Sequence, residues 1–497
     1  MDAGVSRVST STSPGAHVRR TLLTALTLTA ALTATLTATT GLTVTTAAAA
    51  PAAPIPPRTP VTDFNHDGYA DLALGAPGSA VGGQQGAGVV AVVHGSGNGA
   101  DVAHARVLSR DSAGVPGASA GGEYFGERTA TGDLDGDGFT DLVAGSVNGA
   151  HPVVLWGSAT GLSGTGAVGL PGGSGLFSVG DFDGDGHRDL VTDDYPRSDD
   201  PDNDDAGMTV SYGPFERTTG AAARTDRIVT SQTFGPQDFV VGDVTGDGAD
   251  DIVTSHGFEE MAYASKFWKG GKEGVSHTST SLTSSLAGAV ADVDGDGYGD
   301  LVVHDIGDNY EDIAYEKGTV RVLYGSAAGP STTRTTAITQ ETNGVPGSGE
   351  SGDRFGTDIA AGDVNGDGFA DIAVGVPGEA IGDVTDAGAV VLLKGGRGGL
   401  TGTGAQAFHQ STAGVPGASE KGDQFGLQVL LSDLDGDRHA DLTAAAPLED
   451  GAYRDSGAAW TLRGTATGLT TTAITSFGPA TLHAPEPNAQ LGRDLGR

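Results

Sequence analysis

The chain of 497 residues contains no cysteine, which excludes disulfide bonds, thiolate metal sites and a cysteine nucleophile. Basic residues are scarce, because 27 Lys and Arg stand against 63 Asp and Glu, and the formal net charge is −36. This charge argues against binding to nucleic acids or to an anionic membrane surface. No long stretch beyond the N-terminus has the 3.6-residue periodicity of an amphipathic helix. The 83 glycines, which are costly inside helices, favour many short strands joined by turns.

One long uncharged segment lies near the N-terminus, where residues 21–50 follow Arg7, Arg19 and Arg20. Small residues then surround Ala50 and Ala53, a pattern typical of a cleaved export signal. A retained membrane anchor is the alternative, but the many threonines make this a poor span. We expect a signal peptide at 1–50 with cleavage near 50–53, a Pro-rich linker at 51–61, a folded domain at 62–497, and secretion. The export pathway stays open.

An acidic nine-residue pattern, D-x-[D/N]-x-D-G-x-x-D, recurs along the folded part with small departures. Its spacing of 48 to 71 residues indicates a repeat architecture in which each copy belongs to one structural unit. The seven copies begin at Asp63, Asp133, Asp181, Asp243, Asp292, Asp363 and Asp433.

These loops have the composition of calcium sites, since Ca²⁺ prefers six to eight oxygen ligands. Positions 1, 3 and 5 direct side-chain oxygens inward, position 7 offers a backbone carbonyl and position 9 closes the site, as in the first half of an EF-hand loop. Acidic turns without metal are the alternative, but they leave the repulsion among the carboxylates unexplained. The predicted ligands of up to seven Ca²⁺ ions are Asp63, Asn65, Asp67, Tyr69, Asp71, Asp133, Asp135, Asp137, Phe139, Asp141, Asp181, Asp183, Asp185, His187, Asp189, Asp243, Thr245, Asp247, Ala249, Asp251, Asp292, Asp294, Asp296, Tyr298, Asp300, Asp363, Asn365, Asp367, Phe369, Asp371, Asp433, Asp435, Asp437, His439 and Asp441.

The copies differ in their third and sixth positions. Asn65 and Asn365 keep a neutral oxygen, whereas Thr245 offers only a shorter hydroxyl ligand. Arg438 replaces the turn glycine, brings a positive charge close to the ion and occupies a position where glycine serves a positive φ. We expect the sites at 243 and 433 to be the weakest, and the loop with Arg438 to be empty or distorted.

Strand signals surround every acidic loop. An apolar run follows the loop, as at 71–77 and 371–377, and a second run comes after a Gly-rich connector, as at 87–95 and 388–396. Another strand precedes the loop, and a weaker one completes the repeat. Runs that are apolar on both faces indicate strands buried on both sides. Four strands per repeat predict an all-β propeller of seven four-stranded antiparallel blades.

Two short motifs resemble a known family. Phe125-Gly126, Phe355-Gly356 and Phe425-Gly426 each precede an acidic loop, and Gly75-Ala76-Pro77 follows the first one, with Gly375-Val376-Pro377 as a variant. This pattern resembles the FG-GAP repeats of the integrin α-chain N-terminal propeller. The resemblance covers residues 62–497 and is weaker in the three middle repeats. It implies a seven-bladed propeller with calcium in the acidic loops.

The two ends of the repeat array complement each other. No strand with an FG pair precedes Asp63, whereas the chain finishes with Leu491-Gly492 at the position of an FG pair. We therefore expect the C-terminal strand to complete the first blade and close the ring noncovalently. A frayed terminus is the alternative.

Strand alternation places the long connectors 112–126, 342–356 and 412–426, with the acidic stretch 193–205, at the end of the ring opposite the acidic loops. Exposed loops on a rigid scaffold are common binding sites, so we expect partner binding there. In the alternative, they only fill space between blades.

Signals for catalysis are weak. Ser119 stands in a G-x-S-x-G pattern, but within a repeated loop instead of a strand–helix turn, and His187 and His439 are expected to face solvent. We predict a secreted, monomeric calcium-binding and adhesion module for an extracellular protein or glycan, with no nucleic acid partner and no stable membrane insertion; whether it also has enzymatic activity stays open, with a binding module favoured over an enzyme. A hydrolase of the phospholipase type, which FG-GAP repeats also accompany, is the alternative. An acid–histidine cluster at the propeller axis would favour the hydrolase, and exposed tryptophans would favour glycan binding.

Overall fold

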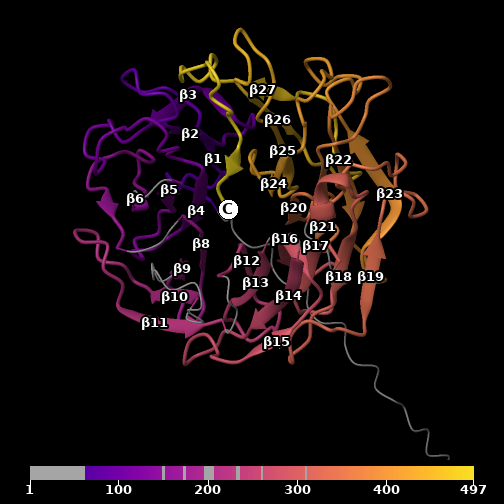
Figure 1. Ribbon diagram of the computed structural model, residues 1–497, viewed down its shortest axis with the longest axis horizontal. Coiled ribbons are helices and arrows are strands. Elements are labelled where there is room, and N and C mark those ends of the chain that lie inside the picture. Colours follow the sequence, from indigo (N-terminus) through magenta and orange to yellow (C-terminus); the bar gives the residue numbers. More distant parts are fainter. Residues whose placement is uncertain are drawn as a thin grey trace, which may run out of the picture. The chain divides into compact units, whose positions relative to one another are not determined.

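The computed structural model describes residues 62–147, 151–171, 175–194, 206–230, 235–258, 261–307 and 311–497, and here the strands form seven four-stranded antiparallel sheets (Figure 1). Blade 1 consists of β28 (Asp494–Leu495), β1 (Leu72–Ala76), β2 (Val89–His94) and β3 (Asp101–Leu108). Blade 2 consists of β4 (Arg128–Gly132), β5 (Asp141–Gly145), β6 (Val153–Leu155) and β7 (Val168–Gly169). Blade 3 consists of β8 (Phe177–Gly180), β9 (Asp189–Asp194), β10 (Gly207–Tyr212) and β11 (Arg224–Val229). Blade 4 consists of β12 (Asp238–Gly242), β13 (Asp251–Phe258), β14 (Met261–Trp268) and β15 (Ser279–Ser281). Blade 5 consists of β16 (Ser285–Ala291), β17 (Asp300–Asp305), β18 (Val320–Leu323) and β19 (Thr335–Ile338). Blade 6 consists of β20 (Ile359–Gly362), β21 (Asp371–Val376), β22 (Ala389–Lys394) and β23 (Thr401–Phe408). Blade 7 consists of β24 (Gln428–Ser432), β25 (Asp441–Ala446), β26 (Ala458–Leu462) and β27 (Thr475–Phe477).

The first strands of the seven blades surround a common axis. Each of β4, β8, β12, β16, β20 and β24 contacts the first strand of the next blade, and β28 contacts both β24 and β4. The chain is therefore a seven-bladed β-propeller, and the predicted fold class is confirmed. A single short 3₁₀ helix, η1 (Glu311–Tyr315), is present among the described residues. In that part of the chain, no helix has the length and apolar character needed to cross a bilayer. The predicted signal peptide and linker, residues 1–61, lie outside the described residues.

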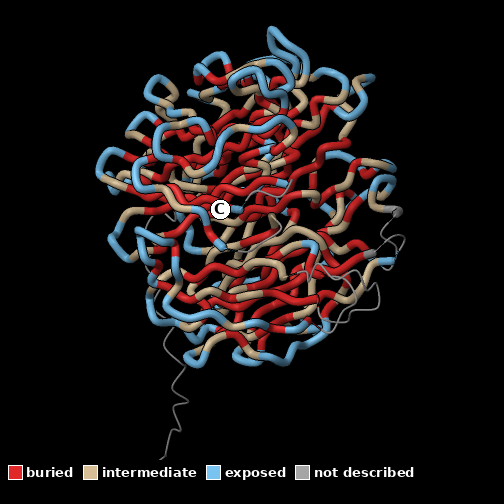
Figure 2. The backbone as a smooth tube through the Cα atoms, turned by 60° about the vertical axis from the view of Figure 1, so that its left-hand side comes forward, coloured by how far each residue is buried: buried red, intermediate tan, exposed pale blue. Residues whose placement is uncertain are grey.

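The hydrophobic core consists of seven clusters, one between each pair of neighbouring blades. Leu392 of blade 6 and Trp460 of blade 7, for example, belong to one cluster, and Val143 of blade 2 and Leu190 of blade 3 belong to another. Strands such as β1 are buried on both faces, as their apolar sequence predicts. Figure 2 shows buried residues running along the strands and exposed residues at the loops. The apolar surface of each blade is thus removed from water only by its neighbours, so blades stabilise one another in sequence around the ring.

The FG and GAP parts of the repeat form one contact between neighbouring blades. Phe425 is fully buried, and its backbone N–H donates to the Ala387 carbonyl of blade 6 at 2.9 Å. The Gly426 carbonyl approaches Gly375 of β21 so closely that a Cβ on Gly375 would lie 2.2 Å from its oxygen. A glycine is needed in this strand because the backbone of the next blade occupies the side-chain space.

The ring closes as the sequence predicts. β28 pairs antiparallel with β1, with Leu495 opposite Leu74. Leu491 takes the place of the FG phenylalanine: it is fully buried, and its N–H donates to the Ser456 carbonyl at 3.1 Å. The Gly492 N–H donates to the Gly75 carbonyl at 2.9 Å. The C-terminal residues therefore complete blade 1 and are not a frayed tail.

Replacing Gly375 with Ala is expected to destabilise the protein by about 1–3 kcal/mol, because the new Cβ must displace the Gly426 backbone. Gly398→Ala is the matched control, since Gly398 is exposed and no atom lies within 4 Å of its hypothetical Cβ. Chemical denaturation of both variants measures the difference. Equal stability of the two variants would contradict the proposed packing of the repeat.

Candidate metal centres

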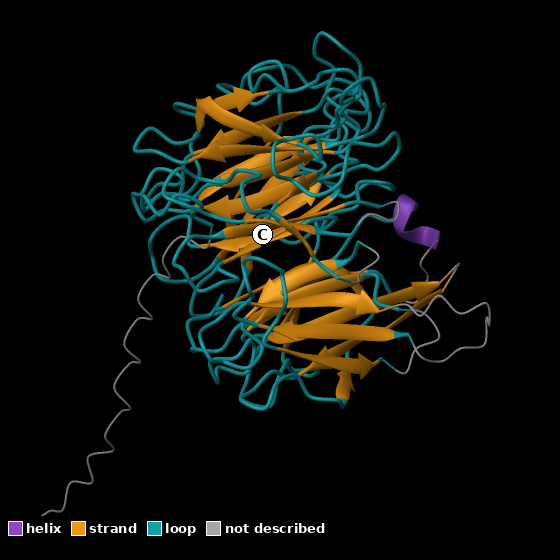
Figure 3. Cartoon of the chain, turned by 90° about the vertical axis from the view of Figure 1, so that its left-hand side faces the viewer, coloured by secondary structure: helices purple, strands orange, loops and turns teal. Residues whose placement is uncertain are grey.

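Six of the seven acidic loops connect the first strand of a blade to its second strand, and the loop that begins at Asp63 leads directly into β1, the second strand of blade 1. The loop that begins at Asp133, for example, joins β4 to β5, and the loop that begins at Asp433 joins β24 to β25. Since strands alternate in direction, these loops lie at one end of the ring, with the turns between third and fourth strands. The remaining connections lie at the other end, and Figure 3 shows loops at both ends of the strands, with η1 standing out from one of them. The predicted placement of the loops is confirmed.

The aspartate at position 9 is the most buried acidic residue of each loop, at most 2% exposed in all seven copies. One of its oxygens accepts the backbone N–H of position 2, and the other accepts the N–H of the glycine that follows the third strand, at 2.7 to 3.3 Å. The glycine donors are Gly95, Gly157, Gly213, Gly270, Gly325, Gly395 and Gly464. This carboxylate therefore joins three segments of one blade, a role that the sequence analysis missed. The recurring pair of a bulky or basic residue and Gly, such as Trp156-Gly157 or Tyr324-Gly325, is the sequence signal for it.

The other acidic positions shape the loop. In the first copy, Asp63 accepts the backbone N–H groups of Asp67 and Gly68 at 3.2 and 2.9 Å. Asp67 in turn accepts the N–H of Tyr69 at 3.1 Å. The same bonds to positions 6 and 7 recur in the other copies. These bonds hold the carboxylates on the inner side of a tight turn.

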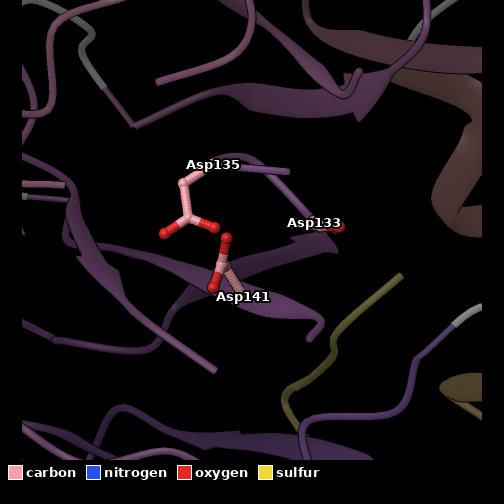
Figure 4. Close-up of side chains that lie close together, drawn as sticks. All are labelled: Asp133, Asp135 and Asp141. Carbon is pink, nitrogen blue, oxygen red and sulfur yellow. The ribbon is translucent and has the colours of Figure 1, made fainter. Parts of the chain in front are cut away.

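Carboxylate oxygens of positions 1, 3 and 9 lie within 4.8 Å of one another in the loops that begin at Asp133, Asp181, Asp292 and Asp433. Figure 4 shows one such group, in which Asp135 and Asp141 face each other. The remaining loops carry Asn65, Thr245 or Asn365 at position 3 and so contribute fewer acids to the group. Asp183 has a buried Oδ1 with no hydrogen-bond partner. Several close oxygens, one of them without a partner, fit a divalent cation such as Ca²⁺.

Burial shifts the acidity of the position-9 aspartates in the absence of a cation. It raises the pKa of Asp141 to about 8 and that of Asp371 to about 6. It raises the pKa of Asp189, Asp251, Asp300 and Asp441 to about 7. A bound cation would favour the ionised form of each group, so metal binding and protonation compete.

Arginines pair with the third-position aspartates, which the sequence analysis also missed. Every loop with Asp at position 3 has such a partner, whereas no arginine pair occurs at Asn65, Thr245 or Asn365 in the described structure. The pairs are Arg217 with Asp135, Arg224 with Asp183, Arg334 with Asp294 and Arg463 with Asp435. Each arginine thus offsets the carboxylate at position 3, which the other three loops lack.

Side chains at position 7 link each loop to the preceding blade. Tyr69 lies against Gly436, and Phe139 packs edge-on against His66 at 5.7 Å between ring centroids. His439 donates from Nδ1 to the Val364 carbonyl at 3.1 Å, and His187 lies against Gly136. The prediction that these two histidines face solvent is therefore wrong, because the neighbouring loop covers one side of each ring.

Arg438 does not distort the seventh loop. Its φ of 72° lies in the left-handed region, close to the 86° to 93° of the equivalent glycines, and its N–H still donates to Asp433 at 2.9 Å. The equivalent glycines have open space beside their hypothetical Cβ atoms, so a side chain fits there at the cost of backbone strain alone. The expected distortion is wrong, and a weaker metal affinity of this loop stays a prediction.

The opposite end of the ring carries the long connectors. Residues 112–126 join β3 to β4 and line a pocket of about 500 Å³ together with Arg110 and His151. Ser119 lies in this connector with no helix after it, so it forms no nucleophile turn. Residues 195–205 of the acidic stretch lie outside the described part of the chain.

Comparison with known proteins supports the repeat assignment. Residues 58–93, 355–393 and 425–462 match the FG-GAP repeat, and residues 133–192 match the FG-GAP-like repeat. The predicted FG-GAP repeats are thus confirmed, in a seven-bladed propeller consistent with that of integrin α-chains. Phosphatidylinositol-glycan-specific phospholipase D of Rattus norvegicus is 30% identical over 169 residues, and that of Mus musculus is 29% identical over 169 residues. Each match covers 34% of this chain and only 19% of the relative's length. Among solved structures, AofleA from Arthrobotrys oligospora shares 8% identity over 72% of this chain and 87% of its own, with a TM-score of 0.38.

The raised pKa values predict how stability depends on pH when calcium is removed. An aspartate in the unfolded chain has a pKa of about 3.9, so the folded state with its raised pKa binds protons more tightly. The contribution of these aspartates to stability is therefore greatest at low pH and is lost as pH rises from about 4 through about 8. In chelator, the melting temperature should fall between about pH 5.5 and about pH 8, whereas in excess Ca²⁺ it should stay level or rise. A chelated protein whose melting temperature climbs over this range would contradict the expectation.

Proposed function

We propose that this chain, whose FG-GAP repeats form a seven-bladed propeller, is a secreted calcium-stabilised module that binds an extracellular protein or glycan. The observation that carries the proposal is the division of the ring into two ends. One end holds seven copies of a loop built around a buried carboxylate, and the other end holds long exposed connectors.

Calcium is the cation that best fits the acidic loops. Ca²⁺ accepts carboxylates, amide carbonyls, hydroxyls and backbone carbonyls in a flexible arrangement, and all of these occur at the ligand positions. Extracellular calcium fills even weak sites. Asp135, Asp183 and Asp294 would bind the ion through the oxygen that does not face arginine, and Asp141 and its equivalents would close the site while holding the third strand.

The connector end is the better candidate for partner binding. The acidic loops are tied to neighbouring blades by backbone hydrogen bonds, such as the one from Thr140 to the Asp63 carbonyl at 3.0 Å, which leaves them little freedom to adapt. The connector 112–126, by contrast, has exposed residues that line the pocket, such as Gly117 and Ala118. A rigid metal-bound end would position adaptable loops at the other end.

Two alternatives receive less support. Around the axis, the described charged groups include Arg497, Asp358, Asp494 and Arg128, with no histidine among the pairs that they form. The acid–histidine cluster that would favour a hydrolase is thus not found among the described axial residues, and the relatives' phospholipase name applies to proteins of which 19% is matched. Glycan binding on exposed tryptophan is also disfavoured, because Trp156, Trp268 and Trp460 are each at most 3% exposed.

Calcium removal tests the first half of the proposal. We expect the acidic loops to contribute five to seven Ca²⁺ ions per chain by atomic absorption, and a large fall in melting temperature on chelation. When the free Ca²⁺ concentration is one hundred times the dissociation constant of a site, binding at that site stabilises the folded state by about 2.7 kcal/mol. Negligible bound calcium together with an unchanged melting temperature would overturn the metal assignment.

Charge reversal at each end tests the second half. Lys421→Glu changes an exposed residue of the connector 412–426, and Arg397→Glu changes an exposed residue at the acidic-loop end. Labelled protein on arrays of matrix proteins and glycans should lose binding with Lys421→Glu, or with Ala118→Arg in the pocket, and keep it with Arg397→Glu. The opposite pattern would place the partner at the acidic-loop end.

A further inference from the structure

We propose a second kind of divalent-cation site, located at the connector end of the ring, between blades 5 and 6. It is separate from the acidic loops and independent of whether they bind metal. Its ligands are three carboxylates and one amide oxygen, from Glu350, Asp353, Glu379 and Gln340.

Two connections bring the carboxylates together. Glu350 and Asp353 lie in the connector between β19 and β20, where the Glu350 N–H donates to Asp353 Oδ2 at 2.6 Å. Glu379 lies between β21 and β22 of the next blade. One carboxylate oxygen from each of the three residues lies within 4.8 Å of the others. Asp353 is 2% exposed, whereas Glu350 is exposed, so the group opens to solvent on one side.

Gln340 adds an oxygen that lacks a partner. Its side chain is 4% exposed, and its Nε2 donates to Glu379 Oε2 at 2.6 Å. The Oε1 atom is bonded to the same amide carbon, is buried and accepts no hydrogen bond. Turning the amide over would set Oε1 against a carboxylate and leave Nε2 without a partner. The amide that carries this buried oxygen contacts Glu379, and an amide oxygen together with three carboxylates is a ligand set that Ca²⁺ prefers.

The connections of blades 6 and 7 repeat the glutamine–glutamate pair at the same spacing. Gln410 donates to Glu449, 39 residues further on, as Gln340 does to Glu379. Gln410 is 1% exposed, and its Oε1 is likewise buried without a partner. The Glu420 N–H donates to Asp423 Oδ2 at 2.7 Å. A buried amide oxygen without a hydrogen-bond partner is energetically unfavourable, because the carbonyl group has lost its water. The occurrence of such an oxygen at both Gln340 and Gln410 therefore indicates that a ligand binds beside each of them.

Blade 2 supplies the natural comparison. Arg110 takes the place of Gln340 in the equivalent connector, and its Nε donates to Glu123, the equivalent of Asp353, at 2.6 Å. Both side chains are buried, at 5% and 6% exposed. In this copy, the guanidinium group of Arg110 thus supplies the positive charge. Where Gln340 replaces the arginine, the carboxylate of Asp353 remains but no side chain supplies the positive charge.

No arginine or lysine forms an ion pair with Glu350, Asp353 or Glu379 among the described residues. The nearby Lys317 donates to Glu341 and to the Gly349 carbonyl, so its ammonium group is already held by other acceptors. A divalent ion would balance most of the charge and satisfy the amide oxygen.

Bound Ca²⁺ per chain, counted by equilibrium dialysis on the full-length protein, tests the site. Gln340→Arg introduces the guanidinium that blade 2 already contains, and Glu379→Gln removes a ligand. Each should lower the count by one ion, and Gln340→Arg combined with Gln410→Arg should lower it by two. Asp383→Asn, at an exposed aspartate of the same connection, is the control and should leave the count unchanged. Asp294→Asn in an acidic loop reports separately on the other class of site.

Glu350→Gln is included because substitutions at the buried residues can prevent folding, whereas the Glu350 side chain is exposed and its replacement should leave the fold intact. It should weaken the binding of one ion at least several-fold while the melting temperature in chelator stays the same. A full count with Gln340→Arg and Glu379→Gln in folded protein would overturn the proposal. An unchanged affinity with Glu350→Gln would do the same, whatever the acidic loops bind.

Discussion

The propeller depends on one group per blade whose burial is energetically unfavourable, the carboxylate at the ninth position of each acidic loop. Its two oxygens hold the loop and the end of the third strand, so removing it would release both. Burying that charge disfavours folding unless a cation or a proton compensates it. The acidic loops therefore hold parts of each blade together and also require a counter-charge, which the proposed metal ions would supply.

The loops do not act alone. Position 8 of a loop donates its backbone N–H to position 1 of the preceding loop, as Ala370 does to Asp292, and position 7 covers position 4 of that loop. Each core cluster also lies between two blades. A cation bound in one loop, as proposed, would thus strengthen two interfaces, and its loss would weaken more than its own blade.

Much of the fold was accessible from sequence, because the repeat combines fixed spacing with strands that are apolar on both faces. The acidic loops, the blade count and ring closure through Leu491-Gly492 all followed from local patterns. What stayed hidden depends on neighbours in space: Arg217 reaches Asp135 from the next blade, and His439 rests on Val364 of the preceding one. The cluster around Gln340 was equally invisible, because its acids come from connections on two different blades and carry no motif of their own.

Ring closure by β28 has a consequence for how the molecule reaches this structure. Asp494 accepts a hydrogen bond from Thr129, which is 365 residues away in the sequence, so this contact forms only after a large loss of chain entropy. Until then, β1 has an unpaired edge beside an incomplete apolar cluster. Such an edge can accept the same strand from a second copy, so strand exchange between molecules competes with closure when the protein folds at high concentration.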